Sequence, residues 1–472
     1  MAAIDWSALR GSLQGHLLLD SDPDYEWTRK PFIARFDEIL PQAVVMAADP
    51  QDVVEALSFA RRHGIEFALR SGGHCFAGYS SSRGMVINVT PMAQVQVDGS
   101  RAVVGAGARI GALTNELIEH GLVVPGGSCP SVGIGGTTLG GGIGVLGRLY
   151  GLTLDHVAAA EVVLADGQVV TADAERHPDL FWALRGAGAG NFGVVTSLTF
   201  EARPAPRMTN FYVVWDFQDA AELLKAWQRW SVEVPEEMTA GLGFTAMDDI
   251  NDPAVAEVFG AMVGTESDAM KLIGELVERC GREPASVNCR EMDYRETGLY
   301  QAGLLSAVNN QVIETPQGHI ERQGCRFTKG EFFDGPIPDE AVDRLAEIFI
   351  AGRTAGEVRG LELAPWGGGY ARTDRHATAF VHRDTSFSLK HAVMVAPEAS
   401  QAQKEAAYRW VSQSWGVVHP WGSNRVYPNF PDPDLADWGT AYYGENFARL
   451  KRIKSQYDPE NVFRFEQSIP LG

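Results

Sequence analysis

The sequence predicts an α+β protein built from two domains. Its 472 residues are more than one hydrophobic core usually holds, which predicts two domains and leaves room for a third. Short apolar runs typical of strands alternate with segments of helical periodicity along the chain. Apolar residues make up 45% of the sequence, an ordinary share for a globular protein with a large core.

The first expected elements are a strand, a helix and a second strand. Residues 43–46 are a short apolar run, and Asp49-Pro50 opens a helical pattern, since Pro suits the first turn of a helix. Residues 66–70 form the second strand and lead directly into a glycine-rich loop.

A further helix and a hairpin follow in the first half. The helix covers residues 110–119 and is closed by Gly121, because Gly readily adopts the left-handed conformation that ends many helices. An Asp-Gly dipeptide at 166–167 lies between two apolar runs, a pattern typical of a β-hairpin.

Arg203–Arg207 is the predicted linker, because its two prolines discourage both strand and helix. After it, a strand at residues 211–215 and helices over residues 219–233 and 267–278 indicate a second α+β domain.

Charge and hydropathy exclude several classes of function. The net charge of −20 argues against a nucleic-acid partner, since no basic stripe is present to neutralise phosphates. No apolar run is long enough to span a bilayer, so no membrane partner is expected. The N-terminus lacks the basic and apolar regions of a secretory signal, which predicts a cytoplasmic location.

The five cysteines, at positions 75, 129, 280, 289 and 325, are too few and odd in number for a disulfide framework. Cys280 and Cys289 could pair or bind a metal, but no CxxC pattern or histidine cluster supports a metal site. We expect reduced, partly buried thiols.

Two glycine-rich loops carry the strongest chemical signal. His74 lies in Arg70-Ser-Gly-Gly-His-Cys-Phe-Ala-Gly-Tyr-Ser, and Cys129 lies in Gly126-Gly-Ser-Cys-Pro-Ser-Val-Gly-Ile-Gly-Gly. Glycines expose backbone N–H groups and tolerate positive φ, so such loops can fold closely around a diphosphate. An imidazole in one loop and a thiol in the other could reach the same bound cofactor.

These loops resemble those of the berberine-bridge-enzyme-like branch of the vanillyl-alcohol-oxidase flavoproteins. In that branch the His is bonded to the 8α-methyl group of FAD and the Cys to C6. The resemblance implies a PCMH-type FAD-binding fold with FAD linked through His74 and Cys129, and a substrate domain built on an antiparallel sheet covered by helices. It also returns the C-terminus to the FAD domain, giving an FAD-binding domain at 1–204, a substrate-binding domain at 205–419 and a berberine-bridge-like segment at 420–472.

The resemblance also implies which residues contact the cofactor. Besides the two linking residues, these are Arg70, Ser71, Gly72, Gly73, Gly78, Tyr79 and Ser80 in the first loop, Val132, Gly133, Gly136, Thr137, Thr138, Gly142 and Ile143 in the second, and Val195, Tyr443 and Asn446. Val195 is expected on the adenine side and Asn446 near the isoalloxazine ring.

The pattern GxGxxG at Gly142–Gly147 offers an alternative, a nicotinamide site. More glycine precedes it where a buried strand is required, and the segment from Gly105 has the spacing GxGxxxG. We therefore do not expect a nicotinamide cofactor.

Tyr427-Pro-Asn-Phe resembles the family's Tyr-x-Asn-Tyr, whose first Tyr removes the substrate hydroxyl proton. A phenol is a weak base at neutral pH unless a positive neighbour or hydrogen bonds favour the phenolate. Lys390 is the candidate cation, although an uncertain strand register leaves His391 as the alternative inward-facing residue. Tyr370, after a glycine turn, is expected to bind substrate, to assist the base or to line the rim.

Two departures from the family pattern bear on the substrate. Phe76 and Phe430 stand where sugar-oxidising relatives often have Tyr, and each change removes a hydroxyl. A less polar pocket favours a hydrophobic or aromatic alcohol over a free hexose.

The resulting prediction is a flavoprotein oxidase of a small-molecule substrate, either a carbohydrate or a hydrophobic or secondary-metabolite alcohol. Hydride would pass to flavin N5, and dioxygen would reoxidise the flavin with release of hydrogen peroxide. The alternatives are a tailoring oxidase that desaturates or cyclises a secondary metabolite, and a flavin-loaded binding protein without significant turnover.

Overall fold

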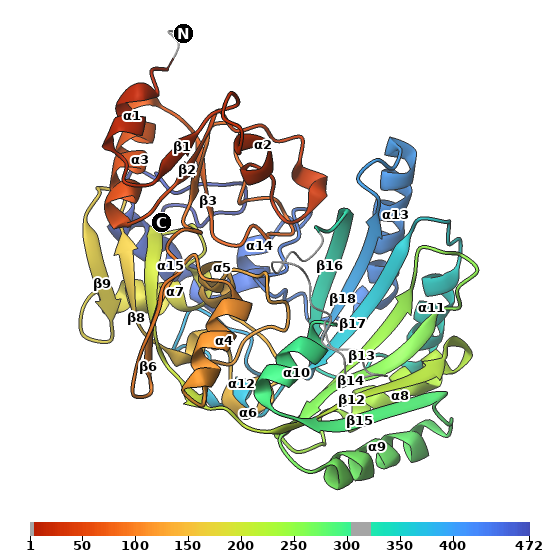
Figure 1. The fold of residues 1–472 in the computed structure, drawn as a ribbon. Coiled ribbons are helices and arrows are strands. Elements are labelled where there is room, and N and C mark those ends of the chain that lie inside the picture. The colour runs from red at the N-terminus through yellow and green to blue at the C-terminus, as the bar shows by residue number, and fades with distance from the viewer. Residues whose placement is uncertain (1–3, 304–321) are drawn as a thin grey trace.

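The computed structural model describes residues 4–303 and 322–472. The fold is α+β, as the sequence predicts. The described residues form three smaller sheets on one side of the molecule and one large antiparallel sheet on the other (Figure 1). All five cysteines are free thiols. Among the described residues, no helix combines the length and apolar composition needed to cross a bilayer.

A four-stranded sheet near the N-terminus supports the first glycine loop. Its order is β1 (His16–Leu18), β2 (Ala43–Met46), β4 (Met85–Asn88) and β3 (Phe67–Arg70). Strands β2, β4 and β3 run parallel, and α3 (Pro50–His63) connects β2 to β3. The Asp49 carboxylate accepts from the Asp52 N–H at the start of α3, and Gly64 ends it at φ 63°. The predicted strand, helix and strand are confirmed.

The second sheet supports the cysteine loop. Its five antiparallel strands are ordered β5 (Val95–Asp98), β6 (Arg101–Gly105), β10 (Val194–Glu201), β8 (Val157–Val163) and β9 (Val169–Asp173). The predicted hairpin joins β8 to β9, with Gly167 at φ 87°. The helices of this half are α4 (Ile110–Glu119), α5 (Ile134–Gly140), α6 (Gly147–Tyr150) and α7 (Pro178–Ala187).

The predicted linker is partly regular structure. Arg203–Pro204 form β11, which pairs with β7 (Leu122–Val123). Pro204 is tolerated because a two-stranded edge ladder does not need its missing N–H.

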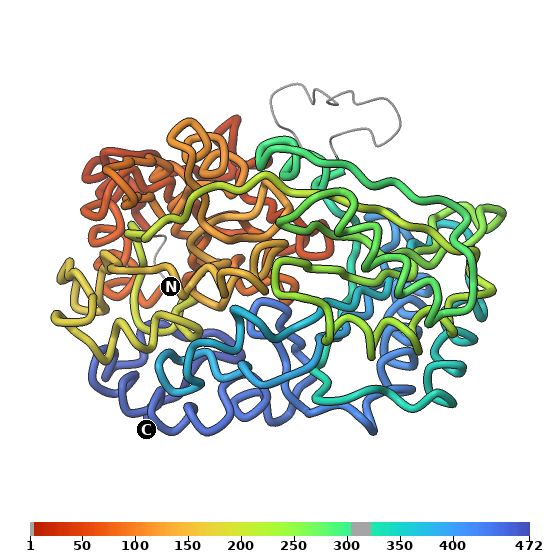
Figure 2. The backbone as a smooth tube through the Cα atoms, turned by 90° about the horizontal axis from the view of Figure 1, so that it is seen from below, coloured from red at the N-terminus to blue at the C-terminus, as the bar shows by residue number. Residues whose placement is uncertain are grey.

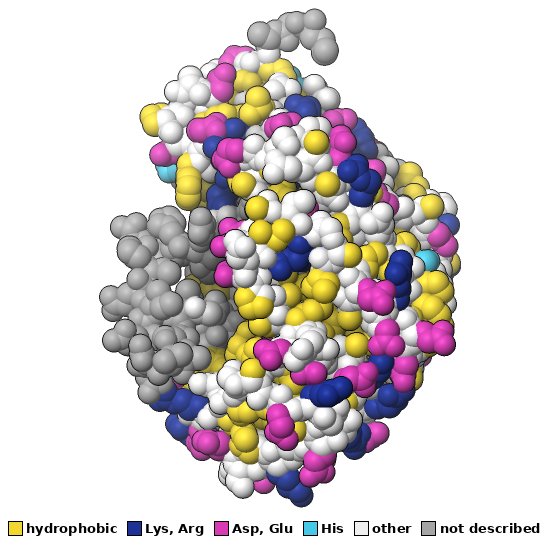
Figure 3. Space-filling view, turned by 90° about the vertical axis from the view of Figure 1, so that its right-hand side faces the viewer, with side chains coloured by type: hydrophobic (Ala, Val, Ile, Leu, Met, Phe, Trp, Pro, Cys, Tyr) yellow, Lys and Arg dark blue, Asp and Glu magenta, His cyan; other side chains and the backbone are white. Residues whose placement is uncertain are grey.

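The large sheet has seven strands, and every neighbouring pair is antiparallel. Its order is β15 (Ser286–Met292), β12 (Met208–Asp216), β14 (Val255–Met262), β13 (Met238–Ala246), β17 (Val358–Pro365), β18 (Phe387–Val395) and β16 (Cys325–Phe333). The outer face is covered by α8 (Ala220–Trp230), α9 (Glu266–Cys280), α11 (Asp339–Ile350) and α13 (Gln401–Val418) (Figure 1). Acidic and basic side chains are interspersed on this side of the molecule (Figure 3).

The C-terminal segment packs against the N-terminal half, and Figure 2 shows it in blue beneath that half. Its helices are α14 (Trp438–Tyr443) and α15 (Phe447–Tyr457). Lys454, fully buried on α15, donates to the Asp458 carboxylate at 2.7 Å and to the Asn191 carbonyl at 2.8 Å. The domain boundaries at residues 204 and 420 stay predictions.

The remaining short elements are α1 (Ser7–Ser12), α2 (Tyr25–Thr28), α10 (Tyr294–Gln301), α12 (Gly369–Arg372) and the 3-10 turns Ala34–Phe36, Thr153–His156, Phe217–Asp219, His419–Trp421 and Gly444–Asn446.

Candidate active site

A cavity of about 590 Å³ lies where the two glycine loops, the inner face of the large sheet and the C-terminal segment meet. Its volume falls in the ordinary range for small-molecule and cofactor sites. Both His74 and Cys129 line it, although they are 55 positions apart in the sequence. The prediction that the two loops face one space is therefore met by the geometry.

The His74 ring is held on two sides. It stacks on Phe32 with ring centroids 3.8 Å apart, and its Nε2 lies 3.1 Å from the Ser131 Oγ. Burial, helped by the positive charge of Arg109, lowers the pKa of His74 to about 4. The imidazole is therefore neutral at pH 7 and keeps a lone pair.

Ser131 connects the two predicted linking residues. Its Oγ lies 3.3 Å from the Cys129 Sγ and 3.1 Å from the His74 Nε2, so one hydroxyl bridges thiol and imidazole. Ser131 is not among the site residues predicted from the sequence. Its only sequence signal is a hydroxyl two positions after the cysteine.

The loops meet backbone to backbone. A Cβ added at Gly72 would lie 2.2 Å from the Gly133 nitrogen, far closer than any side chain tolerates. The Ile110 N–H donates to the Val132 carbonyl at 2.9 Å, which anchors the cysteine loop to the start of α4. Glycine at position 72 is thus required by the approach of the second loop.

The first loop presents polar groups to the cavity. Tyr79 and Ser80 line it, and their hydroxyl oxygens are buried without a hydrogen-bond partner among the described residues. Buried hydroxyls are normally paired, so these two point to a bound polar group. Ser71, Gly72 and Gly73 also line the cavity, and their contact with a cofactor stays a prediction.

Backbone N–H groups of the same loop converge on one spot. Those of residues 77–80 act on the thiol of Cys75, whose pKa burial nevertheless raises. The Gly78 N–H also donates to the Cys75 carbonyl at 3.1 Å, so these N–H groups fold the loop around Cys75. Gly78 contributes its N–H but does not line the cavity, since its α-carbon backs onto Phe36.

The Arg70 side chain is buried, and its guanidinium bonds to neighbouring protein groups. Its guanidinium donates to the carbonyls of Ser80 at 3.0 Å and Thr28 at 2.8 Å, and to the Ser81 Oγ at 2.9 Å. Arg70 lines the cavity wall, but these bonds assign its side chain to shaping the loop.

The second loop follows the prediction in part. Val132, Gly133, Gly136, Thr137 and Ile143 line the cavity. Thr138 and Gly142 lie behind this wall. The Thr138 Oγ1 is buried without a described partner, and the Gly142 N–H donates to the Tyr427 hydroxyl.

Val195 and Tyr443 line the cavity, but Asn446 does not. The Asn446 Nδ2 donates to the carbonyls of Thr378 and Ala379, each at 3.3 Å, and its side chain is buried. Its amide is occupied in holding the loop before β18, and the expected approach of Asn446 to the cofactor stays a prediction.

Tyr427 is buried in the cavity wall. Its oxygen accepts from the Gly142 N–H at 2.7 Å and from the Asn429 Nδ2 at 3.0 Å. Burial raises the pKa of Tyr427 to about 12, while both donors oppose that rise because they favour the phenolate. The phenol is thus held by two donors that would stabilise its deprotonated form.

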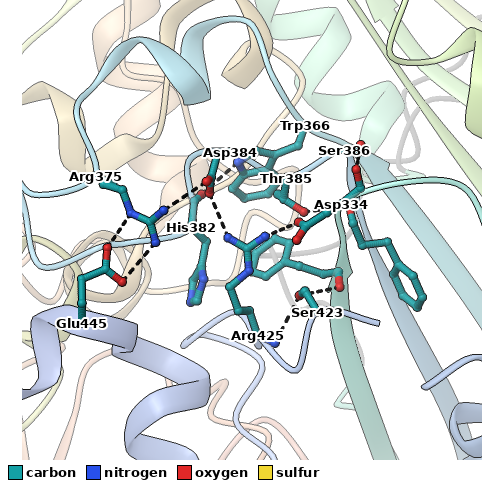
Figure 4. Close-up of polar contacts among 12 residues, drawn as sticks. Asp334, Trp366, Arg375, His382, Asp384, Thr385, Ser386, Ser423, Arg425 and Glu445 are labelled. Carbon is teal, nitrogen blue, oxygen red and sulfur yellow. Dashed lines mark hydrogen bonds and ion pairs between the residues drawn. The ribbon is translucent and has the colours of Figure 1, made fainter. Parts of the chain in front are cut away.

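Ion pairs position the segment that carries Tyr427. Figure 4 shows Arg425 between Asp384 and Asp334, and Arg375 between Asp384 and Glu445. The Arg425–Asp384 distance is 2.9 Å. Arg425, two residues before Tyr427, is thus tied by ion pairs to the loop before β18 and to the turn after β16. Arg375 extends this network to Glu445 in the C-terminal segment.

The register of β18 settles which residue faces the cavity. Lys390 lines it, and its Nζ lies 2.5 Å from the Glu362 carboxylate and 4.6 Å from the Phe430 ring centre. His391 points to the opposite face, where its Nδ1 lies 2.9 Å from the Ser414 Oγ on α13. The Lys390 ammonium is paired with Glu362. In the part of the chain that the structure describes, no hydrogen bond joins it to Tyr427, so no contact supports direct activation of the phenol by Lys390.

Tyr370 is a buried residue and does not form the rim. It stacks on Trp366 with centroids 4.4 Å apart, and its hydroxyl donates to the Gly144 carbonyl at 3.2 Å. Burial raises its pKa above the ordinary value. Its hydroxyl anchors the glycine tract that also carries Gly142.

Comparison with known proteins agrees with this geometry. A model described as "FAD binding domain" matches residues 41–173, and one described as "Berberine and berberine like" matches residues 426–470. The FAD-linked oxidoreductase YgaK of Bacillus subtilis (strain 168) is 31% identical, over 97% of this chain and 97% of its own. This chain belongs to the berberine-bridge-enzyme-like FAD-linked oxidoreductases.

Other members of the family extend the comparison. Chitooligosaccharide oxidase of Gibberella zeae is 30% identical, over 91% of this chain and 87% of its own. Among solved structures, BBE-like 1 of Physcomitrella patens has a TM-score of 0.89 at 26% identity, covering 99% of this chain and 100% of its own. These likenesses span both halves of the molecule, so the PCMH-type fold and the FAD-binding domain are shown.

Proposed function

We propose that this protein is an oxidase that holds FAD through His74 and Cys129 and oxidises an alcohol group of a small molecule. The observation that carries the proposal is the bridge through Ser131, which brings an imidazole and a thiol from separate loops to one cavity. Glucooligosaccharide oxidase from Acremonium strictum, which shares this fold at a TM-score of 0.87 and 23% identity, is described with a 6-S-cysteinyl, 8α-N1-histidyl FAD.

The residues fit this cofactor. The orphaned hydroxyls of Tyr79 and Ser80 suit polar groups of the dinucleotide. When bound, FAD would accept a hydride at N5 and pass the electrons to dioxygen, releasing hydrogen peroxide.

His74 is prepared to act as a nucleophile. Its pKa of about 4 keeps it neutral, and the contact with Ser131 occupies Nε2. The ring nitrogen that carries no proton keeps its lone pair, and that lone pair is the nucleophile.

Cys129 lies in a positive environment. Arg109 and Arg326 are close enough that a Cys129 thiolate raises the pKa of each guanidinium, opposing the lowering caused by burial. Covalent attachment through sulfur uses the thiolate, which is the nucleophilic form of cysteine.

Tyr427 would accept the hydroxyl proton of the substrate. The N–H groups of Gly142 and Asn429 stabilise the negative charge that the phenol oxygen must carry to act as a base. The alcohol loses this proton and a hydride and becomes a carbonyl.

The test is acid precipitation of the purified protein, followed by mass spectrometry of its peptides. The yellow colour is expected to stay with the precipitate, and the flavin mass is expected on the peptides that carry His74 and Cys129. Replacing either residue by Ala should remove one link, while Cys75→Ala, a matched change in the first loop, should leave both. Release of all flavin from the unmodified protein would refute the proposal.

Product analysis decides between the reaction types. A ketone, aldehyde or lactone supports alcohol oxidation, whereas a new C–C or C=C bond would show a tailoring oxidase. A flavin that no substrate reduces under anaerobic conditions would indicate a binding protein.

A further inference from the structure

We infer that the substrate carries a carboxylate, which Arg326 and Lys390 bind at the sheet side of the cavity. This inference rests on the proposed function, because it names the class of alcohol that Tyr427 would act on: a hydroxy acid. The residues that support it lie on three adjacent strands, β16, β17 and β18.

The two cations share one protein carboxylate. Glu362 on β17 stands directly opposite Lys390 on β18 and pairs with it at 2.5 Å. Arg326 on β16 is also near enough for its guanidinium pKa to be raised by Glu362, although burial lowers it more. All three side chains line the cavity, so this part of its wall carries one unbalanced positive charge.

Arg326 has unused hydrogen-bonding capacity. Within residues 4–303 and 322–472, the only hydrogen bond that its guanidinium donates goes to the Gln323 Oε1 at 3.0 Å, and its Nε is buried without a partner. A guanidinium presents five N–H donors in a planar fork that matches a carboxylate. Glu362 is already paired with Lys390, so an anion arriving in the cavity would gain charge-assisted hydrogen bonds from the unused donors of Arg326.

The positive wall contrasts with the rest of the molecule. The whole chain has a net charge of −20, yet Glu362 is the only carboxylate among the described residues lining the cavity, where Arg70, Arg326, Lys390 and Arg464 also occur. Local charge of this sign concentrates anions in a cleft.

Aromatic rings separate these cations from the expected base. Arg326 lies 5.2 Å from the Phe76 ring centre and Lys390 lies 4.6 Å from that of Phe430. The two rings are 5.6 Å apart, and Phe430 packs edge-on to Tyr427 at 4.9 Å.

A substrate reaching from the Tyr427 hydroxyl to the cations would lay an apolar ring or chain along these phenylalanines. The pocket is thus apolar in its middle and positive at one end. Phe76 and Phe430 still favour a hydrophobic or aromatic alcohol, but the positive end of the pocket adds a carboxylate to it.

The binding test uses benzoate and benzamide, which differ in charge and little in shape. Calorimetry with the flavin-containing protein should show benzoate binding at least about tenfold more tightly, because a hydrogen bond to a charged group is stronger than a neutral one. Arg326→Gln should abolish this preference, and Glu362→Gln should increase it. The control is Arg344→Gln, an exposed change on α11 that should have no effect.

A turnover test uses 4-(hydroxymethyl)benzoate and the corresponding benzamide. The KM for the acid should be lower by about tenfold, and Arg326→Gln should raise it towards that of the amide with the covalent flavin content unchanged. Equal binding of benzoate and benzamide would overturn the inference. The inference would also be overturned if Arg326→Gln lost bound FAD and still bound benzoate as before, because the positive charge of Arg326 would then bind the cofactor and not the substrate.

The two hypotheses fail differently. If the protein carries no covalent flavin and oxidises neither alcohol, the proposed function is wrong, and calorimetry still decides whether the anion site exists. If neutral alcohols reduce the flavin as well as their carboxylate analogues, the function stands and the inference is wrong.

Discussion

Replacing Tyr427 by Phe tests the proposed base with a single-atom change. The ring and its contact with Phe430 are retained, and only the oxygen that accepts from Gly142 at 2.7 Å and from Asn429 at 3.0 Å is lost. Asn429 keeps a second bond, to a backbone carbonyl at 2.8 Å, so the Gly142 N–H is the donor left unpaired. A buried unpaired donor costs about 1–3 kcal/mol, and we expect the free energy of unfolding to fall by that amount.

The effect on catalysis should be much larger than the effect on stability. Loss of a positioned base slows proton transfer by about 10²–10⁴-fold, equivalent to about 3–5 kcal/mol of barrier. The assay is anaerobic reduction of the flavin in a stopped-flow spectrometer, with an alcohol that the unmodified protein oxidises. Since only the phenolate accepts a proton and burial raises the pKa of Tyr427 to about 12, the unmodified rate should rise from neutral to alkaline pH. The rate of the variant should not.

Tyr370→Phe is the matched control. Tyr370 is equally buried, but its hydroxyl makes only longer contacts, 3.2 and 3.4 Å, with the backbone of Gly144. We expect flavin reduction within about tenfold of the unmodified rate, with the pH profile retained. Equal rates in the two Phe variants, or an unchanged pH profile in Tyr427→Phe, would refute the assignment of the base.

Three further substitutions test the surrounding structure. Ser131→Ala should lower the fraction of protein with both covalent links, measured by peptide mass spectrometry, while Ser131→Thr should restore it; full linkage in the Ala variant would remove the role of the bridge. Gly72→Ala should reduce the bound FAD measured by absorbance, because its methyl group would collide with the cysteine loop, whereas Gly274→Ala, with open space at its Cβ, should not. Lys454→Met should lower the urea-measured free energy of unfolding by about 3–5 kcal/mol by leaving a buried carboxylate unpaired, and Lys271→Met on the exposed side of α9 should change it by less than about 0.5 kcal/mol.

Local sequence patterns predicted the parts of the site that local chemistry determines. The boundaries of α3 and α4 follow from Asp49, Pro50 and the glycines after each helix, which act within one turn. The two glycine loops were recognisable because glycines beside a histidine or a cysteine already indicate a loop that folds closely around a cofactor. The fold class and family followed from these loops and are confirmed.

What the sequence left open depends on residues far apart. The choice between Lys390 and His391 required the register of β18, and a shift by one residue would exchange them. The bridge from Ser131 to His74 spans 57 positions. Asn446 was expected near the cofactor, but the sequence could not show that its amide donates to backbone carbonyls of the loop before β18.

The chain divides the chemistry of the cavity among its parts. The two glycine loops supply His74 and Cys129, which would hold the cofactor, and the C-terminal segment supplies Tyr427. The inner face of the large sheet supplies Lys390 and Glu362, which are adjacent across two strands and contact neither loop's linking residue. If the proposed roles are correct, changes on β17 and β18 should alter which substrate is bound without disturbing the cofactor. Arg326 is the exception, because Glu362 and Cys129 both oppose the lowering of its guanidinium pKa by burial. Flavin content must therefore be measured alongside substrate binding in every variant of that residue.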